Sequence, residues 1–225
     1  MNISAKELAG YFDHTLLRPN VVGTEIDALC SEAVEFGFRT VCVNPIWVPQ
    51  AFACLEDSAV EVCSVVGFPL GQHTQDIKAR EAAAAVAAGA REIDMVIRLD
   101  ALLSGNHQTV RDDITAVVEA SYPALVKVIL ETCYLTDELK RQACRLSVEA
   151  GAAFVKTSTG FGSGGASIDD IRLMRGVVGP HLGVKASGGI RSCTDAMALI
   201  DAGASRIGAS ASVSIVQDMA ATGCT

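Results

Sequence analysis

Apolar positions follow two alternating patterns along the chain. Short runs with little polar interruption have the length of β-strands, and the longer stretches between them repeat their apolar residues with helical spacing. This alternation predicts eight β/α units. The predicted strands cover 11–16, 39–43, 61–67, 92–97, 125–131, 153–157, 182–186 and 205–208.

Helix-boundary signals support the same division. A threonine that can cap a helix precedes several amphipathic stretches. The predicted pairs are Thr24 with 25–36, Thr74 with 76–88 and Thr136 with 137–150. Glycine, which favours the turn after a helix, precedes several predicted strands at Gly37, Gly89, Gly151 and Gly203. We expect these glycines at the bottom of the repeated units.

Eight units with uniformly apolar strands predict a TIM (β/α)8 barrel, with a short helix at the N-terminus. A doubly wound open sheet is the alternative. The length of 225 residues fits one barrel, since such domains commonly reach about 200–250 residues. We therefore expect a single domain over 1–225. In a barrel, the chemistry lies at the carboxyl ends of the strands.

Three lysines interrupt these apolar strands at one constant interval. Lys127, Lys156 and Lys185 each stand in a predicted strand, one β/α unit apart, and Asp94 stands in the strand before them. A buried ammonium group requires partners or a polar cavity, because burial removes its hydration. The spacing predicts equivalent heights on successive strands. We therefore expect one carboxylate to meet three lysines inside the barrel.

Clustered lysines suggest Schiff-base chemistry. Burial and a neighbouring ammonium both lower the pKa of a lysine, which makes the amine nucleophilic toward carbonyls. An iminium accepts electrons, so a carbon–carbon bond can break through an enamine, and Asp94 could move the protons. The competing interpretation is structural: Asp94 and Lys127 form a buried ion pair, and the other lysines reach solvent. Spacing does not say which lysine is the nucleophile.

Glycine clusters after the last strands predict a phosphate site. Backbone amides near a helix start bind phosphate, often after strands seven and eight of a barrel. The clusters include Gly188 and Gly189, the Gly208 to Ser210 segment with a helix expected near Ser210, and Gly160 after the sixth strand. Arg191 and Arg206 are the cations that we expect near these loops.

Six segments together resemble class I deoxyribose-phosphate aldolases. Written in one-letter code, they are FDHTLL from Phe12, EIDMVI from Glu92, VKVILET from Val126, VKTSTGF from Val155, VKASGGI from Val184 and SRIG from Ser205. They extend from the first strand to the eighth in the family's order. The segments around Lys156 and Lys185 are the most specific.

The resemblance implies reversible cleavage of 2-deoxy-D-ribose 5-phosphate to D-glyceraldehyde 3-phosphate and acetaldehyde, without metal or other cofactor. It implies that Lys156 forms the Schiff base, Lys185 lowers its pKa, and Asp94 relays protons with Lys185, while Lys127 supports Asp94. The implied phosphate contacts are Gly160, Gly188, Gly189, Gly208 and Ser210. Asp13 and Thr15 are the implied sugar contacts. The implied role is deoxyribonucleotide catabolism.

The sequence departs from the family pattern at three places. Arg98 replaces an expected asparagine, and Ala211 replaces a serine or glycine near the phosphate. The tyrosine-terminated tail of some members is missing. Two other functions stay open: a Schiff-base aldolase or transaldolase for another sugar phosphate, and a barrel that binds a phosphorylated metabolite without catalysis.

Composition restricts partners and location. The net charge of −8 disfavours nucleic acid and anionic membranes as partners. We expect a cytoplasmic protein, because the start lacks a signal peptide and no apolar run could span a membrane. The expected assembly is a homo-oligomer, a dimer or tetramer, although the sequence does not give the oligomeric state. The eight cysteines, without a C-x-x-C pair, predict buried thiols and no disulfides. Cys42 is interpreted as a small buried apolar residue.

Overall fold

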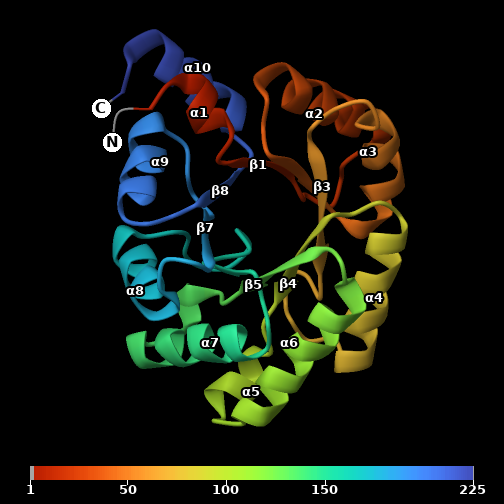
Figure 1. Cartoon of the computed structure of the whole chain (residues 1–225), viewed down its shortest axis with the longest axis vertical. Coiled ribbons are helices and arrows are strands. Elements are labelled where there is room, and N and C mark those ends of the chain that lie inside the picture. Colours follow the sequence, from red (N-terminus) through yellow and green to blue (C-terminus); the bar gives the residue numbers. More distant parts are fainter. Residues whose placement is uncertain (1–2, 225) are drawn as a thin grey trace.

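A computed structural model describes residues 3–224 and shows a closed parallel barrel. Helices surround the strands in Figure 1. The eight strands pair in sequence order, and β1 closes the barrel by pairing with β8. The predicted TIM barrel is confirmed, because this closing pair is absent from an open sheet. The strands are β1 (Phe12–Leu16), β2 (Thr40–Val43), β3 (Glu61–Val66), β4 (Glu92–Val96), β5 (Leu125–Ile129), β6 (Phe154–Lys156), β7 (Gly183–Ser187) and β8 (Arg206–Ala209).

The helices follow the strands, with the predicted short helix at the N-terminus. They are α1 (Ala5–Ala9), α2 (Gly23–Phe36), α3 (Val48–Cys54), α4 (Gln75–Ala87), α5 (Leu99–Leu103), α6 (His107–Ser121), α7 (Asp137–Glu149), α8 (Ile168–Val178), α9 (Cys193–Asp201) and α10 (Ser212–Thr222). Two 3-10 turns are η1 (Pro45–Trp47) and η2 (Thr132–Tyr134). No helix among residues 3–224 has the length and apolarity needed to cross a bilayer.

Of the three threonines predicted to cap helices, only Thr136 does so through its side chain. Thr136 caps α7 by accepting a hydrogen bond from the backbone amide of Leu139, as predicted. Thr74 occupies the cap position of α4 without a side-chain cap bond. The Thr24 prediction is wrong, because α2 begins two residues earlier, at Gly23, and the Glu25 carboxylate accepts the Val22 amide instead.

The helix-ending glycines lie where the sequence places them. Gly37 ends α2 in the left-handed conformation, with φ 71° and ψ 40°, which a side chain would disfavour. Positive φ values also occur at Gly89, Gly151 and Gly203. These residues turn the chain into the next strand.

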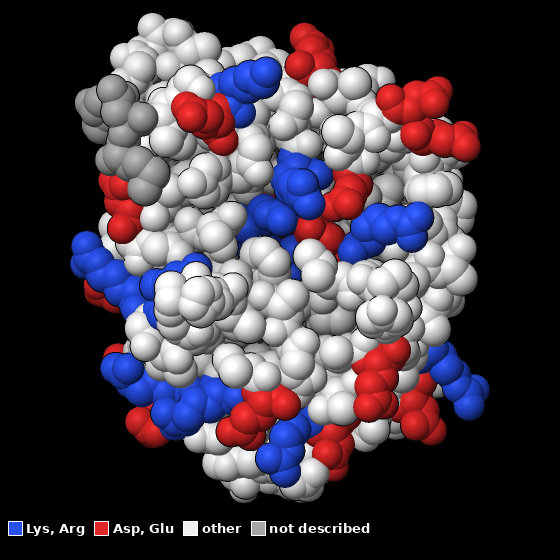
Figure 2. All heavy atoms as spheres, in the orientation of Figure 1, with Lys and Arg blue, Asp and Glu red and all other residues white. Residues whose placement is uncertain are grey.

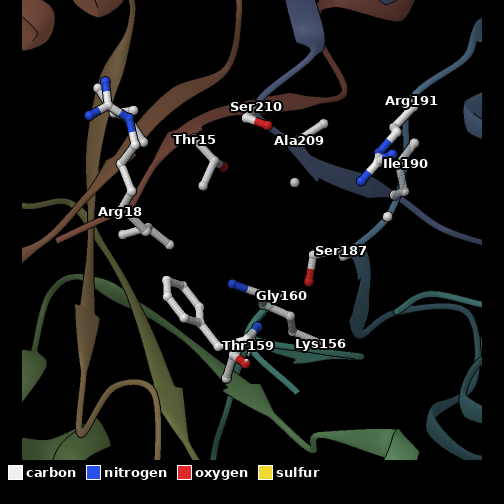
Figure 3. A pocket seen from close by; sticks show the side chains of 16 residues that line it. Thr15, Arg18, Lys156, Thr159, Gly160, Ser187, Ile190, Arg191, Ala209 and Ser210 are labelled. Atoms are coloured by element: carbon white, nitrogen blue, oxygen red, sulfur yellow. Dashed lines mark hydrogen bonds between the residues drawn. The ribbon is translucent and has the colours of Figure 1, made fainter. Parts of the chain in front are cut away.

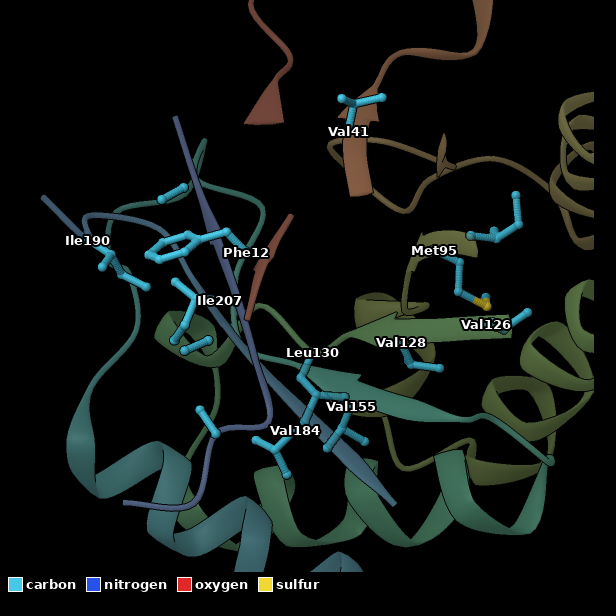
Figure 4. Packing of buried hydrophobic residues seen from close by; sticks show 14 of the residues in the cluster. Phe12, Val41, Met95, Val126, Val128, Leu130, Val155, Val184, Ile190 and Ile207 are labelled. Carbon is cyan, nitrogen blue, oxygen red and sulfur yellow. The ribbon is translucent and has the colours of Figure 1, made fainter. Parts of the chain in front are cut away.

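Strand residues divide between two environments. In β5, Val126 and Val128 pack outward into the main apolar cluster, where Figure 4 shows them with residues of neighbouring strands. Lys127, between them, points into the barrel, because successive side chains of a strand face opposite sides. Inside the barrel, a small cluster of Leu17, Cys42, Cys63 and Val65 lies beside the charged groups. The buried Cys42 agrees with its interpretation as a small core residue.

The cysteine prediction is partly wrong. Cys193, at the start of α9, forms a disulfide with Cys224 although 31 positions separate them. Sequence spacing gave no sign of this bond, because it depends on the last helix packing beside α9. Cys54 is exposed and Cys133 is half-buried. The four buried free thiols are Cys30, Cys42, Cys63 and Cys144.

Candidate active site

Asp94, in β4, is the centre of a buried charge cluster. Its Oδ1 accepts a hydrogen bond from Lys127 Nζ at 2.7 Å, and its Oδ2 accepts from Lys156 and Lys185 at 2.6 and 2.7 Å. All four side chains are buried. The predicted convergence is confirmed. The structural alternative, with Lys156 and Lys185 reaching solvent, is wrong.

The three lysines do not share one height, contrary to the expectation from their spacing. Lys156 lies directly opposite Lys185, whereas Lys127 lies opposite Phe154. Lys127 is therefore two residues nearer the bottom of the barrel than Lys156. The strands of a closed barrel are staggered, so residues at equal sequence intervals shift along the axis. Asp94 lies opposite Lys127 and reaches upward to the other two.

The charges in the cluster stabilise one another. Burial alone would raise the pKa of Asp94, but Lys127, Lys156 and Lys185 together lower it well below its ordinary value. Burial alone would lower the pKa of Lys185, but Asp13 and Asp94 raise it above its ordinary value. Asp94 is therefore a carboxylate and Lys185 an ammonium across the physiological pH range.

A second set of charges adjoins the first. Asp13 accepts hydrogen bonds from Lys185 and, at 2.6 Å, from Arg206. Arg206 also donates to both oxygens of Glu92, at 3.1 and 3.2 Å, and Glu92 forms an ion pair with Lys127 at 2.5 Å. Every one of these carboxylate groups is fully buried. The cluster is therefore larger than the sequence predicted.

This second set bears on two expectations and adds one residue. Asp13 is not on the cavity wall, because its side chain is fully buried and both its oxygens accept hydrogen bonds, from Lys185 and Arg206. Arg206 points into the barrel, so it is not free to bind phosphate. Glu92 was missed by the sequence analysis. Its position two residues before Asp94 was the available signal, because alternate residues of a strand share one face.

A cavity of about 430 Å³ opens above the cluster at the carboxyl ends of the strands. Lys156 lies on its wall, across from Thr15 and Ser210 in Figure 3. Figure 2 shows the same face, where acidic and basic atoms meet near the centre of the molecule. The predicted site residues on the wall are Thr15, Lys156, Gly160, Gly188, Gly189, Gly208 and Ser210. The wall also includes Arg18 and Phe161, which the sequence analysis did not select.

Two of the glycines serve different purposes. A Cβ on Gly189 would meet no atom within 4 Å, so its backbone faces open space, and its φ of +78° favours glycine. A Cβ on Gly208 would lie 2.9 Å from Lys185 Cε. Gly208 therefore makes room for the Lys185 side chain, in addition to lining the cavity.

The expected anion-binding geometry is present in part. Ser210 precedes α10, which begins at Ser212 with Ala211 as its cap residue, slightly later than predicted. The free amides of this helix start favour a negative group. Arg191 lies on the cavity wall, as expected from the sequence. Arg98 ties its own loop to Asp100 through hydrogen bonds of 2.8 and 2.7 Å, which is how the departure at this position is accommodated.

Two groups of possible metal ligands lie within the charge cluster, and the second consists of Asp13, Cys63 and Glu92. The ligand atoms of Cys42, Cys63 and Asp94 lie within 4.8 Å of one another. Cys63 Sγ also contacts the Lys127 ammonium, at 3.3 Å. The donor set fits a metal ion poorly, because the carboxylate already holds three ammonium groups whose charge repels a cation.

Comparison with known proteins agrees with this geometry. The model of the DeoC/LacD family of aldolases matches residues 8–218. A deoxyribose-phosphate aldolase from a Thermoanaerobacter species is 55% identical over 94% of this chain and 96% of its own length. Its counterpart from Brevibacillus brevis is 56% identical over 95% and 96%, respectively.

Solved structures give the same result. The tetrameric deoxyribose phosphate aldolase from Aeropyrum pernix superimposes with a TM-score of 0.89 and 37% identity, covering 95% of this chain and 91% of its own. Orotidine 5'-phosphate decarboxylase from Pyrococcus horikoshii, at 15% identity and a TM-score of 0.66, shares the fold alone. The sequence match over nearly the whole chain and the buried lysine cluster lead to one conclusion: the chain belongs to the DeoC/LacD family of aldolases.

Proposed function

We propose that the protein reversibly cleaves 2-deoxy-D-ribose 5-phosphate to D-glyceraldehyde 3-phosphate and acetaldehyde through a Schiff base on Lys156. One observation carries the choice of lysine. Lys156 lies on the cavity wall, whereas Lys127 and Lys185 are fully buried below it. A substrate in the cavity can therefore reach only the Lys156 amine among these three lysines.

The chemistry follows from this arrangement. The neutral Lys156 amine attacks the C1 aldehyde of the open-chain sugar, and loss of water gives an iminium ion. A base removes the proton of the C3 hydroxyl, the C2–C3 bond breaks, and the electron pair moves into the iminium to form an enamine. Glyceraldehyde 3-phosphate leaves. Protonation of the enamine at C2 and addition of water then release acetaldehyde and the free amine.

Asp94 and Lys185 are proposed to move the protons. Lys185 Nζ and Lys156 Nζ share Asp94 Oδ2, so a proton can pass along this short path to or from a water in the cavity. The fixed positive charge of Lys185 also favours the neutral amine at Lys156. Lys127 and Asp13 hold Asp94 and Lys185 in position. The iminium itself accepts the electrons, so we propose no metal or organic cofactor, and dialysis against EDTA should leave activity unchanged.

The phosphate is proposed to bind among the glycine loops of the cavity wall. The contacts that we propose are Gly160, Gly188, Gly189, Gly208 and Ser210, with Thr15 beside the sugar. The exposed backbone at Gly189 and the start of α10 support this placement. The cavity is large enough for a five-carbon sugar phosphate, since ligand sites commonly measure about 300–1,000 Å³.

Borohydride trapping tests the proposal and its alternatives. Borohydride with acetaldehyde should add an ethyl group to one lysine, and peptide mapping should find it on Lys156. An adduct on Lys127 or Lys185 would refute the assignment. An aldolase for another sugar phosphate would trap its own carbonyl compound and not acetaldehyde. A barrel that only binds metabolites would trap nothing, and the Lys156→Ala variant provides the blank.

The oligomeric state and the cellular location of the protein are also inferred. We infer a cytoplasmic homo-oligomer, a dimer or tetramer, built from one domain over 1–225 and acting in deoxyribonucleotide catabolism. The similar aldolase from Aeropyrum pernix is tetrameric, which supports an oligomer. A phosphorylated sugar is an intracellular substrate, which supports the location. Light scattering on the purified protein measures the mass, and a monomer would contradict the oligomer.

A further inference from the structure

Glu131 has an unusual backbone conformation close to the cavity. It follows β5 and precedes η2, with φ 53° and ψ 63° in the left-handed region. Among residues 3–224 it is the only residue other than glycine with a positive φ. Side chains disfavour this region, and residues adopt it where surrounding contacts hold them, often at functional sites.

The Glu131 carboxylate accepts two hydrogen bonds from one residue of the loop after β6. Its Oε1 accepts the backbone amide of Thr159 at 3.1 Å, and its Oε2 accepts the Thr159 hydroxyl. The same hydroxyl oxygen accepts the amide of Phe161 at 3.0 Å. One carboxylate thereby fixes both ends of the 159–161 segment.

The Glu131 carboxylate is buried without an ion-pair partner among residues 3–224. Glu131 is 3% exposed, and the structure records no ion pair to it within residues 3–224. A buried carboxylate without a cation depends on hydrogen bonds, and Thr159 donates both of those recorded for it among residues 3–224. The neighbouring backbone is also anchored, because the Leu130 amide donates to the Lys156 carbonyl at 2.9 Å. Glu131 therefore connects the fifth strand rigidly to the segment after Lys156.

The 159–161 segment forms part of the cavity wall. Gly160, with φ +87°, lies on that wall, and Figure 3 shows it with Thr159 beside Lys156. Phe161 also lines the cavity, and its ring meets Phe68 edge-on with centroids 5.4 Å apart. A small movement of Thr159 would therefore shift both the Gly160 backbone and the aromatic wall relative to the lysine.

We propose that Glu131 is a positioning residue of the aldolase site: by holding Thr159 it sets the Gly160 backbone against the substrate phosphate. The role rests on the proposed function. Glu131 touches neither the substrate nor the reacting atoms, and it acts through Thr159. Its loss should therefore weaken recognition of the phosphorylated sugar more than the bond-breaking step.

Steady-state kinetics of two variants test this role. Glu131→Ala and Glu131→Gly should each raise KM for deoxyribose 5-phosphate roughly tenfold or more, because two hydrogen bonds to a charged acceptor are lost, while kcat changes less. The kcat/KM preference for deoxyribose 5-phosphate over deoxyribose should fall by a similar factor. Glu131→Gln, which can still accept the Thr159 amide, should give an intermediate value.

The glycine variant separates the carboxylate from the backbone. Glycine adopts the left-handed conformation without strain, so wild-type kinetics in Glu131→Gly would show that only the turn matters and would overturn the proposal. An unchanged substrate preference in all three variants, with altered Tm alone, would overturn it as well. Glu119→Gln, an exposed site on α6, provides the charge-matched control and should behave as wild type.

Trapping of the wild-type enzyme shows whether a negative result refutes the role of Glu131 or the proposed aldolase function. If borohydride and acetaldehyde leave Lys156 of the wild type unmodified, the aldolase function itself fails. If Lys156 is trapped but the variants keep the wild-type substrate preference, only the role of Glu131 fails.

Discussion

Lys156 and Lys185 lie directly opposite each other in β6 and β7, and both donate to the same oxygen of Asp94. Their surroundings nevertheless differ. Lys185 is fully buried and also contacts Asp13, whereas Lys156 reaches the cavity. This difference assigns separate tasks to two neighbouring lysines: one keeps its charge, and the other meets the substrate.

Replacing Lys185 with leucine should remove a positive charge beside Lys156. A larger share of Lys156 would then be protonated at neutral pH, so kcat/KM at pH 7 should fall strongly and the active limb of the pH profile should shift to alkaline pH. The kcat/KM profile from pH 6 to 10, with circular dichroism to check folding, measures the shift. A lower but unshifted profile would mean that burial alone sets the state of Lys156.

The Asp94→Asn variant should lose the proton step. Asparagine keeps the shape of the side chain but cannot take up or release the proton, and removal of a general acid or base costs about 10²–10⁴ in rate. Deuterium exchange into the methyl group of acetaldehyde reports this step directly. Exchange at the wild-type rate would make Asp94 structural. Asp57→Asn, at an exposed position, is the matched control.

Acid should destabilise the fold through the buried carboxylates. Lys185, Lys127 and Arg206 outweigh the effect of burial and lower the pKa of Asp13, and Asp94 is lowered likewise. The unfolded chain, with aspartate pKa values of about 3.9, then binds more protons than the folded one. The resulting stability is present above about pH 4 to 5 and is lost as pH falls toward the folded values.

Urea unfolding between pH 7 and pH 3 measures this dependence. The free energy of unfolding should decrease with acidification, and the decrease should be smaller in Asp94→Asn, which lacks one of the two carboxylates. The variant should also be less stable at pH 7, because three buried ammonium groups lose a partner. Equal slopes for both proteins would contradict the lowered pKa of Asp94.

A side chain at Gly189 should interfere with phosphate binding. Gly189→Val fills the open space in front of this backbone, so KM for deoxyribose 5-phosphate should rise steeply while the slow cleavage of deoxyribose changes little. The φ of +78° adds strain, which Gly105→Val controls, because exposed Gly105 has φ +77° and equally open surroundings. Equal losses on both substrates would indicate damage to the barrel.

The sequence predicted what depends on local repetition. Apolar periodicity indicated the eight strands, and the interval between Lys156 and Lys185 indicated that they would be neighbours. Contacts that depend on the closure and stagger of the barrel were not predictable from spacing. Arg206 is one example: only the pairing of β8 with β1 brings it to Asp13 and away from the phosphate loop. The lower position of Lys127 is another.

Long-range contacts outside the barrel were missed for the same reason. The Cys193–Cys224 bond requires the last helix to lie beside α9, and no pattern near either cysteine indicates it. Lys78 had no distinguishing feature in the sequence of its amphipathic helix. It is nevertheless fully buried, because the neighbouring α6 supplies Asp113.

The pair of Lys78 and Asp113 should be important for stability. Lys78 Nζ donates to Asp113 at 2.7 Å and to the Val96 carbonyl, at the end of β4, at 2.9 Å. Lys78→Met would leave Asp113 buried without its cation, and breaking a buried pair in this way costs about 3–5 kcal/mol. Urea unfolding measures the loss, and Lys6→Met, at an exposed site, is the control.

Removing both charges of this pair should be less harmful than removing one. In Lys78→Met/Asp113→Leu no charge remains buried without a partner, so we expect the double variant to recover much of the stability lost in Lys78→Met. The Val96 carbonyl still loses its donor, which limits the recovery. A double variant as unstable as Lys78→Met would mean that the lost contact with β4 dominates, and that the unpaired carboxylate contributes little.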